Sequence, residues 1–473
     1  MSSSTSDLTR RRAVWTSTAM ILVVAVAGGP TGCLKQLVAV TPPSDTITSG
    51  NINTVTQAVA VYAGAVGDFA GGFGGAQITG TGYPYVLETG MLTDELLDLY
   101  YPQLYGVDSR TADTGVAGGG AYDALQTSRI QARLATIALR KFTAAPPSDV
   151  AESYMLEGYS ELLLAEYICS GIPLSTLNFG GGITYSPGLT TTQVLQAALA
   201  HFDTASTYAG SASVQVGVSV GRGRAWLDLD EYDSAAAAVV NVPTSGVYAV
   251  QYGTQLNLGN NVWAYLGTGG FPEITVANDE GQNGLNFVSA HDPRVPTTTN
   301  GPLVSYNAFS SAASPIVLAS GIEAQLIQAE AALSHGTPAW LDMLNALRTN
   351  GTYTTAPDAT NPSQIDTTYN AGTAGVAGLA PLTDPGTANA RVDLVFRERA
   401  FWMYLTGHRE GDLRRLVRQY GRPEGTVYPT GPYLLPVVRT GVPVSYGTQV
   451  VGLPDANEQR ENPVYHGCFN LGA

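Results

Sequence analysis

The sequence predicts a mainly α-helical protein in which helical hairpins pack against an irregular, loop-rich lobe with few short strands. In much of the chain, apolar residues recur at steps of three and four over long stretches, which is the period of a buried helix face. Residues 251–317 differ, because they are rich in Gly, Asn and Thr and contain only short apolar pieces. With 473 residues, of which 44% are hydrophobic, the chain can bury a sizeable core.

The N-terminus predicts an exported and lipid-anchored protein. The basic residues Arg10–Arg12 precede the apolar run Ala13–Ala27, which is too short to span a membrane comfortably. A small residue then precedes Cys33, as in a bacterial lipoprotein signal. We therefore predict a signal peptide at residues 1–32, lipidation of Cys33 and a tether at residues 33–50. An ordinary secretory signal or a short membrane anchor is the alternative.

Charge and cysteine usage narrow the possible partners. The 23 basic and 38 acidic residues give a net charge of −15, so the chain repels nucleic-acid phosphates. Besides Cys33, the chain contains only Cys169 and Cys468. In an exported protein these two allow one disulfide, and two buried free thiols are the alternative. Neither has the neighbour spacing of a metal site, and we predict no metal and no cofactor.

Apolar periodicity places the helices in order along the chain. Single helices are predicted at Asn53–Val66, Tyr122–Phe142, Asp149–Tyr167, Thr191–Tyr208, Gly321–Ser334 and Trp340–Arg348. Gly221–Leu229 and Tyr232–Val240, joined by two acidic residues and rich in Ala, look like one tetratricopeptide-type hairpin. Several such hairpins would stack as a solenoid. This repeat-like part is expected at about 51–245 and 318–349, and the loop-rich lobe at about 251–317.

One segment fits the pattern of a hydrolase nucleophile. Gly217–Gly221 reads G-x-S-x-G, and Ala212–Val216 before it could form the strand that a nucleophile elbow at Ser219 needs. That fold also needs repeated strand–helix alternation, whereas this chain offers helix after helix. We therefore expect a turn that leads into a helix at this position.

Aromatic residues in loops are the candidate ligand contacts. Tyr101 and Tyr105 lie in a stretch of mixed aromatic and acidic residues, and Trp263 and Tyr265 lie in the loop-rich lobe. A tyrosine or tryptophan ring offers a flat apolar face with a polar edge, which suits sugars and peptides. We predict these four as ligand contacts; packing in the core is the alternative for each.

Three acids in the same stretch could serve catalysis. A polysaccharide-degrading enzyme needs two carboxylates facing each other across a cleft, and Asp94, Glu95 and Asp98 are the candidates. Neighbouring acids more often form a solvated helix face, which is the simpler interpretation.

The segment Arg391–Tyr420 combines a buried apolar stripe with many arginines. Gly407 interrupts the stripe, and glycine is favoured just after a helix end because it adopts positive φ without strain. We therefore predict C-terminal helices within 391–420, at Asp393–Thr406 and about Asp412–Tyr420, that meet at a corner. The charged groups at that corner must pair or face water.

Motifs in this segment and elsewhere resemble one family. Glu398-Arg399-Ala400, Gly407-His408-Arg409 and Asp412-Leu413-Arg414-Arg415 resemble the C-terminal signature of SusD/RagB-type lipoproteins, although Trp402 and Thr406 stand where that family has glutamates. Further partial matches are Thr93-Asp94-Glu95, Gly171–Leu174, His291–Arg294, the helix around Glu323–Ala331 with the following L-N-x-x-R, Tyr433–Pro436 and Asn462-Pro463.

The resemblance implies a tetratricopeptide-like fold with an irregular lobe, in a single domain at residues 51–473. It further implies an outer-membrane lipoprotein, anchored by lipid and facing outside. Such a protein binds a nutrient, either glycan or oligopeptide, and delivers it to a TonB-dependent SusC-like transporter without catalysis. The alternatives are a helical-repeat lipoprotein that scaffolds envelope assembly and a polysaccharide-degrading hydrolase.

Overall fold

The computed structural model of the protein describes most of the chain after residue 51. The described residues are 52–75, 83–101, 104–111, 119–178, 182–255, 258–267, 271–357, 365–371, 379–437 and 443–473, with the backbone alone given for 350–357 and 365–371. They belong to one compact unit, Ile47–Ala473. The predicted signal peptide, Cys33 and the tether lie outside them. No helix in this part of the chain is long and apolar enough to cross a membrane.

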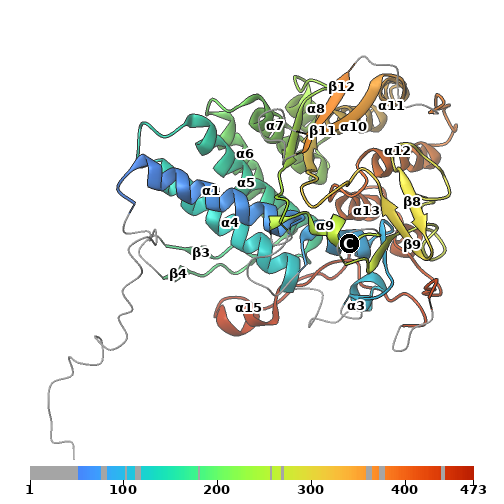
Figure 1. Cartoon of the computed structure of the whole chain (residues 1–473), viewed down its shortest axis with the longest axis horizontal. Coiled ribbons are helices and arrows are strands. Elements are labelled where there is room, and N and C mark those ends of the chain that lie inside the picture. The colour runs from blue at the N-terminus through green and yellow to red at the C-terminus, as the bar shows by residue number, and fades with distance from the viewer. Residues whose placement is uncertain are drawn as a thin grey trace, which may run out of the picture. The chain divides into compact units, whose positions relative to one another are not determined.

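Helices between residues 55 and 350 form a stack in which they pack in chain order (Figure 1). They are α1 (Val55–Phe73), α4 (Gly119–Leu139), α5 (Pro147–Tyr167), α6 (Thr191–Ser206), α7 (Ala212–Asp228), α8 (Tyr232–Val239), α10 (Gly321–Ser334) and α11 (Ala339–Asn350). Each contacts the next along the series, with α8 contacting α10. Thr54 and Thr190 begin α1 and α6 with capping boxes, and Ser320 caps α10. The predicted fold class, mainly helical with tetratricopeptide-like hairpins, is confirmed.

Helix α5 lies at the centre of this stack. Almost all of its residues after Asp149 are buried, because α4, α6 and α7 all pack against it. Small residues permit the close approach: a Cβ on Gly158 would lie 3.0 Å from the Phe202 ring, and one on Gly221 only 2.6 Å from it.

The nucleophile-elbow alternative is wrong. Ala212–Val216 forms the first turns of α7, not a strand, and Ser219 lies in the middle of that helix. The predicted turn into a helix is also too late in the chain, because the helix begins at Ala212 with Ser211 as its N-cap. The two glycines of the G-x-S-x-G segment have no side chain, and this lets α7 pack closely against neighbouring elements.

The described strands form short antiparallel pairs. They are β1 (Leu96–Asp98) with β7 (Ile274–Val276), β2 (Ile172–Pro173) with β5 (Gly188–Leu189), β3 (Thr176–Leu177) with β4 (Ile183–Thr184), β6 (Val247–Val250) with β10 (Ile316–Ser320), β8 (Thr297–Asn300) with β9 (Leu303–Tyr306), and β11 (Gly351–Pro357) with β12 (Ile365–Ala371). The β11–β12 hairpin lies between α11 and the C-terminal helices, where the sequence predicted no strand. Its Thr-rich strands lack the apolar alternation that would have revealed them.

Short helices complete the architecture. They are α2 (Tyr85–Leu92), α3 (Tyr105–Asp108), α9 (Asn261–Tyr265), α14 (Glu424–Val427) and α15 (Ala456–Glu461). The last two long helices are α12 (Ala388–Trp402) and α13 (Arg409–Arg418). They meet at the predicted corner, but α12 ends at Trp402 and not at Thr406, and α13 begins at Arg409 and not at about Asp412. Gly407, with a φ of +75°, lies in the turn between them.

The residues of the family signature form buried ion pairs. Glu398 accepts from Arg294 at 2.7 Å and from Arg348 at 2.6 Å, and the Glu398 carboxylate is almost fully buried. Arg294 comes from the matched D-P-R segment and Arg348 from the matched L-N-x-x-R helix. Three separately recognised motifs therefore converge on one carboxylate and hold α12 against α11 and the lobe.

A second buried cluster joins α13 to α12 and α10. Arg415 donates to both carboxylate oxygens of Glu330 and to Asp412, the last at 2.9 Å. Arg399 donates to both oxygens of Asp412, at 2.8 to 3.0 Å. All four side chains are at least 96% buried, and a third buried carboxylate, Asp228, lies 3.4 Å from Arg415. These ion pairs are therefore out of contact with water.

The acids proposed for catalysis instead support the fold. Asp94 accepts from Arg409 at 2.6 and 2.8 Å, and Glu95 accepts from the backbone N–H of Leu405 at 3.0 Å. Asp94 and Glu95 are each 1% exposed. They therefore form neither a solvated helix face nor an open pair of carboxylates across a cleft.

A disulfide joins Cys169, just after α5, to Cys468, with 5.9 Å between the Cα atoms. The adjacent backbones also pair, since the N–H of Phe469 donates to the carbonyl of Ser170 at 2.6 Å. The C-terminal segment is thus fastened to the end of the central helix.

We expect the Cys169→Ala/Cys468→Ala variant to lose about 2 kcal/mol of unfolding free energy, because the bridge restricts the unfolded chain over a separation of 299 residues. Urea unfolding followed by far-UV circular dichroism would measure the loss. Wild-type protein treated with dithiothreitol should show the same midpoint as the variant. Equal midpoints for the oxidised wild type and the variant would contradict a stabilising bridge.

Candidate functional site

Four aromatic rings gather where the loop-rich lobe meets the helical part. We call Tyr83, Tyr101, Tyr265 and Phe271 the aromatic cluster. The ring centroids of Tyr101 lie 5.4 Å from Tyr83 and 5.8 Å from Tyr265, in edge-to-face arrangements, and Phe271 lies 6.2 Å from Tyr265. The three tyrosines are half-buried, and Phe271 is 54% exposed. The cluster therefore combines fixed rings with accessible aromatic surface.

Pairing of β1 with β7 brings the two halves of the cluster together. Asp98 stands opposite Ile274 in the register, so the residues after β1 lie beside those before β7. The N–H groups of Leu99 and Tyr100 both donate to the carbonyl of Glu273, at 3.0 and 3.1 Å. These bonds fix the turn that presents Tyr101.

Helix α9 positions Tyr265. The fully buried Asn260 caps α9 by accepting from the N–H of Trp263 at 2.9 Å, and it donates to the carbonyl of Ser314 at 2.9 Å. After the helix, the carbonyl of Tyr265 accepts from the N–H of Glu273 at 3.1 Å. The short helix is thus fastened at both ends although it has only one turn.

The four predicted ligand contacts have different positions in the structure. Tyr101 and Tyr265 come together in the cluster. Trp263 is half-buried, and among the described residues no ring contact joins it to the cluster. Tyr105 is only 6% exposed and donates to the carbonyl of Leu99 at 3.1 Å. Its ring packs in the core, so it offers no face to a ligand.

Sequence reasoning missed Tyr83 and Phe271 as members of the cluster. Both residues lie in segments of the sequence that contain several aromatic residues. Neither has a local sequence pattern that distinguishes it from the other aromatic residues nearby. Phe271 follows a Gly-rich stretch of sequence, and its side chain is more than half exposed. Exposure of this kind is visible only in the folded chain.

Buried carboxyl groups lie behind the cluster. Asp98 accepts from the N–H groups of Tyr100 and Tyr101, at 3.1 and 2.8 Å, and so holds the turn below the Tyr101 ring. Burial, together with the charge of Asp108, raises the pKa of Asp98 to about 8. Burial also raises the pKa of Asp108 to about 7. Asp98 is therefore largely protonated at neutral pH.

These shifts predict how stability changes with pH. An unfolded Asp has a pKa of about 3.9, so between that value and about 8 the native state holds a proton on Asp98 that the unfolded state releases. The stability contributed by this group is complete below pH 4 and is lost as pH rises to 8. We expect Asp98→Asn, which keeps the acceptor oxygen, to remove up to about 1.4 kcal/mol of this dependence per pH unit.

Urea unfolding of wild type and Asp98→Asn at pH 5, 7 and 9 would test this expectation. The variant should gain on the wild type as pH rises. Asp230→Asn, at an exposed position, serves as the control and should run parallel to the wild type. Parallel curves for wild type and Asp98→Asn would contradict a raised pKa at Asp98.

One group of side chains has the composition of a metal site. Glu157, Glu161 and His201 place potential ligand atoms within 4.8 Å of one another. His201 already directs Nδ1 to Glu161 at 2.8 Å and Nε2 to Glu157 at 3.5 Å. Burial lowers the pKa of His201, but the hydrogen bond to Glu161 and its charge outweigh this and raise the pKa overall. His201 and Arg133, which lies 3.9 Å from Glu157, therefore already engage these two carboxylates.

Comparison with known proteins identifies the fold. The sequence matches no family model and no curated protein. The structure is similar to SusD superfamily proteins from Bacteroides fragilis (TM-score 0.61, 12% identity, 88% of this chain and 99% of that chain) and Parabacteroides distasonis (TM-score 0.61, 13% identity, 90% and 100%). It is also similar to surface glycan-binding protein A from Bacteroides uniformis (TM-score 0.58, 12% identity, 88% and 99%). The chain therefore has the fold of the SusD superfamily, as the resemblance of its motifs predicted.

Proposed function

We propose that this protein is a surface-exposed, lipid-anchored outer-membrane protein that binds a glycan and delivers it to a TonB-dependent SusC-like transporter. An oligopeptide is the alternative nutrient. The aromatic cluster carries this proposal. Its three tyrosines and Phe271 combine an apolar surface with hydroxyl groups, and a sugar ring offers apolar C–H faces and polar edges to match.

Two further features support a binding role. The fold is shared along almost its full length with a protein described as a surface glycan-binding protein. The buried acids that could have suggested hydrolysis are occupied in fixing the fold, at Asp94 and Glu95, or in holding the Tyr101 turn, at Asp98. Binding without bond cleavage is the activity that these side chains favour.

The partner and the location rest on the N-terminal sequence and on the family resemblance. Cleavage before Cys33 and lipidation there would leave a tether at residues 33–50 before the folded unit. Such a tether would keep the folded unit at the membrane, within reach of a transporter barrel.

Affinity electrophoresis of the mature protein in gels that contain single polysaccharides would test glycan binding. We expect retardation by at least one neutral or acidic polysaccharide. In parallel, isolation of the lipidated protein from its native envelope should recover a large TonB-dependent barrel in near-stoichiometric yield. Absence of the barrel under conditions that keep other envelope complexes intact would contradict the transporter role. Failure to bind any polysaccharide or peptide pool would contradict nutrient capture.

A further inference from the structure

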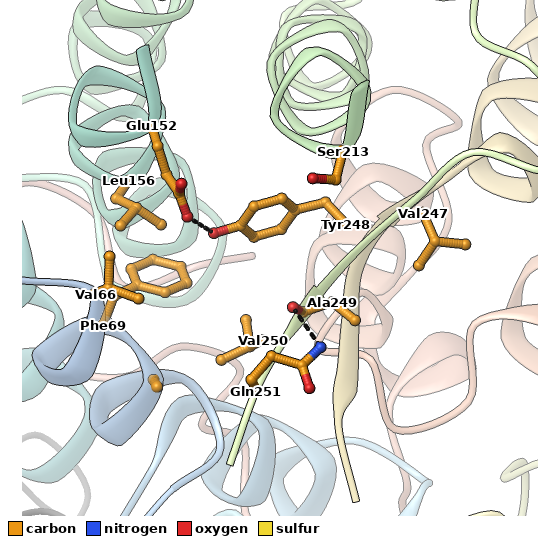
Figure 2. Close-up of a pocket in the computed structure, with 11 residues that line it drawn as sticks. Val66, Phe69, Glu152, Leu156, Ser213, Val247, Tyr248, Ala249, Val250 and Gln251 are labelled. Atoms are coloured by element: carbon orange, nitrogen blue, oxygen red, sulfur yellow. Dashed lines mark hydrogen bonds between the residues drawn. The ribbon is translucent and has the colours of Figure 1, made fainter. Parts of the chain in front are cut away.

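A recess on the helical part lies apart from the residues of the aromatic cluster. It opens between α1, α5, the beginning of α7 and strand β6, and its volume is about 390 Å³ (Figure 2). That volume falls in the range of pockets that hold small molecules. None of the residues that line it belongs to the aromatic cluster.

The polar end of the recess is a carboxylate held in place by two hydroxyl groups. Glu152 accepts from Tyr248 at 2.6 Å through Oε1 and from Tyr62 at 2.7 Å through Oε2. Figure 2 shows the carboxylate and the Tyr248 hydroxyl meeting at the edge of the recess. Burial and the charge of Glu152 raise the pKa of both tyrosines, so both hydroxyls stay protonated and act as donors. The two donors orient Glu152 but do not neutralise it.

Glu152 has no cationic partner in the described part of the chain. Some buried glutamates there pair with arginine, as Glu166 does with Arg224, whereas Glu88 and Glu95 are held by hydrogen bonds without an ion pair among the described residues. No lysine, arginine or histidine among the described residues forms an ion pair with Glu152. A carboxylate accepts about four hydrogen bonds, so two sites on Glu152 are available to a donor from outside the chain.

The remainder of the recess is apolar. Val66 and Phe69 from α1, Leu156 from α5 and Val250 from β6 line it beside Glu152. Phe69, Leu156 and Val250 are at most 5% exposed, so these side chains are held by the core. Ser213 and Gln251, both exposed, lie at the outer edge.

We propose that this recess is a second binding site, which takes a small organic cation: a primary ammonium or guanidinium group on a compact apolar body. The charged group would pair with Glu152 in surroundings where water screens the attraction less than in bulk solution. The apolar body would cover Val66, Phe69 and Leu156. The site is independent of glycan binding by the aromatic cluster.

Isothermal titration calorimetry of the full mature protein with benzylammonium chloride would test this site. Benzyl alcohol and sodium benzoate have the same ring with a neutral and an anionic end. We expect benzylammonium to bind at least tenfold more tightly than benzyl alcohol, and benzoate not to bind. Equal affinity for the ammonium and the alcohol would overturn the proposal, because the carboxylate would then contribute nothing.

Variants locate the binding. Glu152→Gln should weaken benzylammonium binding at least tenfold, whereas the matched control Glu231→Gln, at an exposed position, should leave it unchanged. If Glu152→Gln fails to fold, the Ser213→Trp variant tests the location of the site instead. A large side chain at this exposed edge should block the recess without disturbing the contacts of Glu152. Undiminished binding in folded Glu152→Gln or in Ser213→Trp would overturn the proposal.

Discussion

Replacement of Arg415 by methionine is expected to lower the free energy of unfolding by about 3 to 5 kcal/mol at neutral pH. Arg415 donates to both oxygens of Glu330 and to Asp412, and its guanidinium lies 5.0 Å from the centroid of the Phe396 ring. Methionine fills much of the same volume but supplies no charge. Glu330 and Asp412 would then share the charge of Arg399 alone, and one carboxylate would stay buried without compensation.

The loss should depend on whether the partner carboxylate is present. The double variant Arg415→Met/Glu330→Leu removes both charges and should be more stable than Arg415→Met alone. Urea unfolding of the two single variants and the double variant gives the coupling energy. A loss below about 1 kcal/mol for Arg415→Met would show that the cluster does not hold α13 in place.

Replacement of both Tyr101 and Tyr265 by alanine is expected to weaken glycan binding about 100-fold, which corresponds to about 3 kcal/mol. Each ring is estimated to contribute about 1.5 kcal/mol through contact with the sugar face. The two rings lie 5.8 Å apart and support each other, so removal of one also leaves the other less fixed. Calorimetry with the polysaccharide found by affinity electrophoresis would measure the change.

Two controls separate the cluster from aromatic surface in general. Tyr185→Ala removes an exposed tyrosine outside the cluster and should leave affinity within about threefold. Trp263→Ala should likewise have little effect, because Trp263 has no ring contact with the cluster among the described residues. A larger loss for Trp263→Ala than for the double tyrosine variant would move the ligand site away from the cluster.

Local patterns in the sequence determined much of the helical architecture. Gly321–Ser334 was predicted with the observed boundaries, and Asp149–Tyr167 within two residues of them. These helices carry their apolar period in neighbouring residues, and capping residues mark where they begin. Helix α7 was placed nine residues too late, because Gly217, Gly221 and Gly223 obscure the period over its length. The Arg-rich corner was also foreseen, but α12 ends at Trp402, before the predicted end at Thr406, so Gly407 with its positive φ lies in the turn between the helices and does not cap α12.

The tertiary structure alone decided which distant residues meet. The sequence did not indicate that Glu398 pairs with both Arg294 and Arg348, or that Asp94 pairs with Arg409 across 315 positions. It also could not separate Tyr101, which lies in the aromatic cluster, from Tyr105 four residues later, which packs in the core. Helix formation depends on residues three and four positions apart, whereas a binding surface depends on contacts between segments hundreds of residues apart. Periodicity records the first kind of information and not the second.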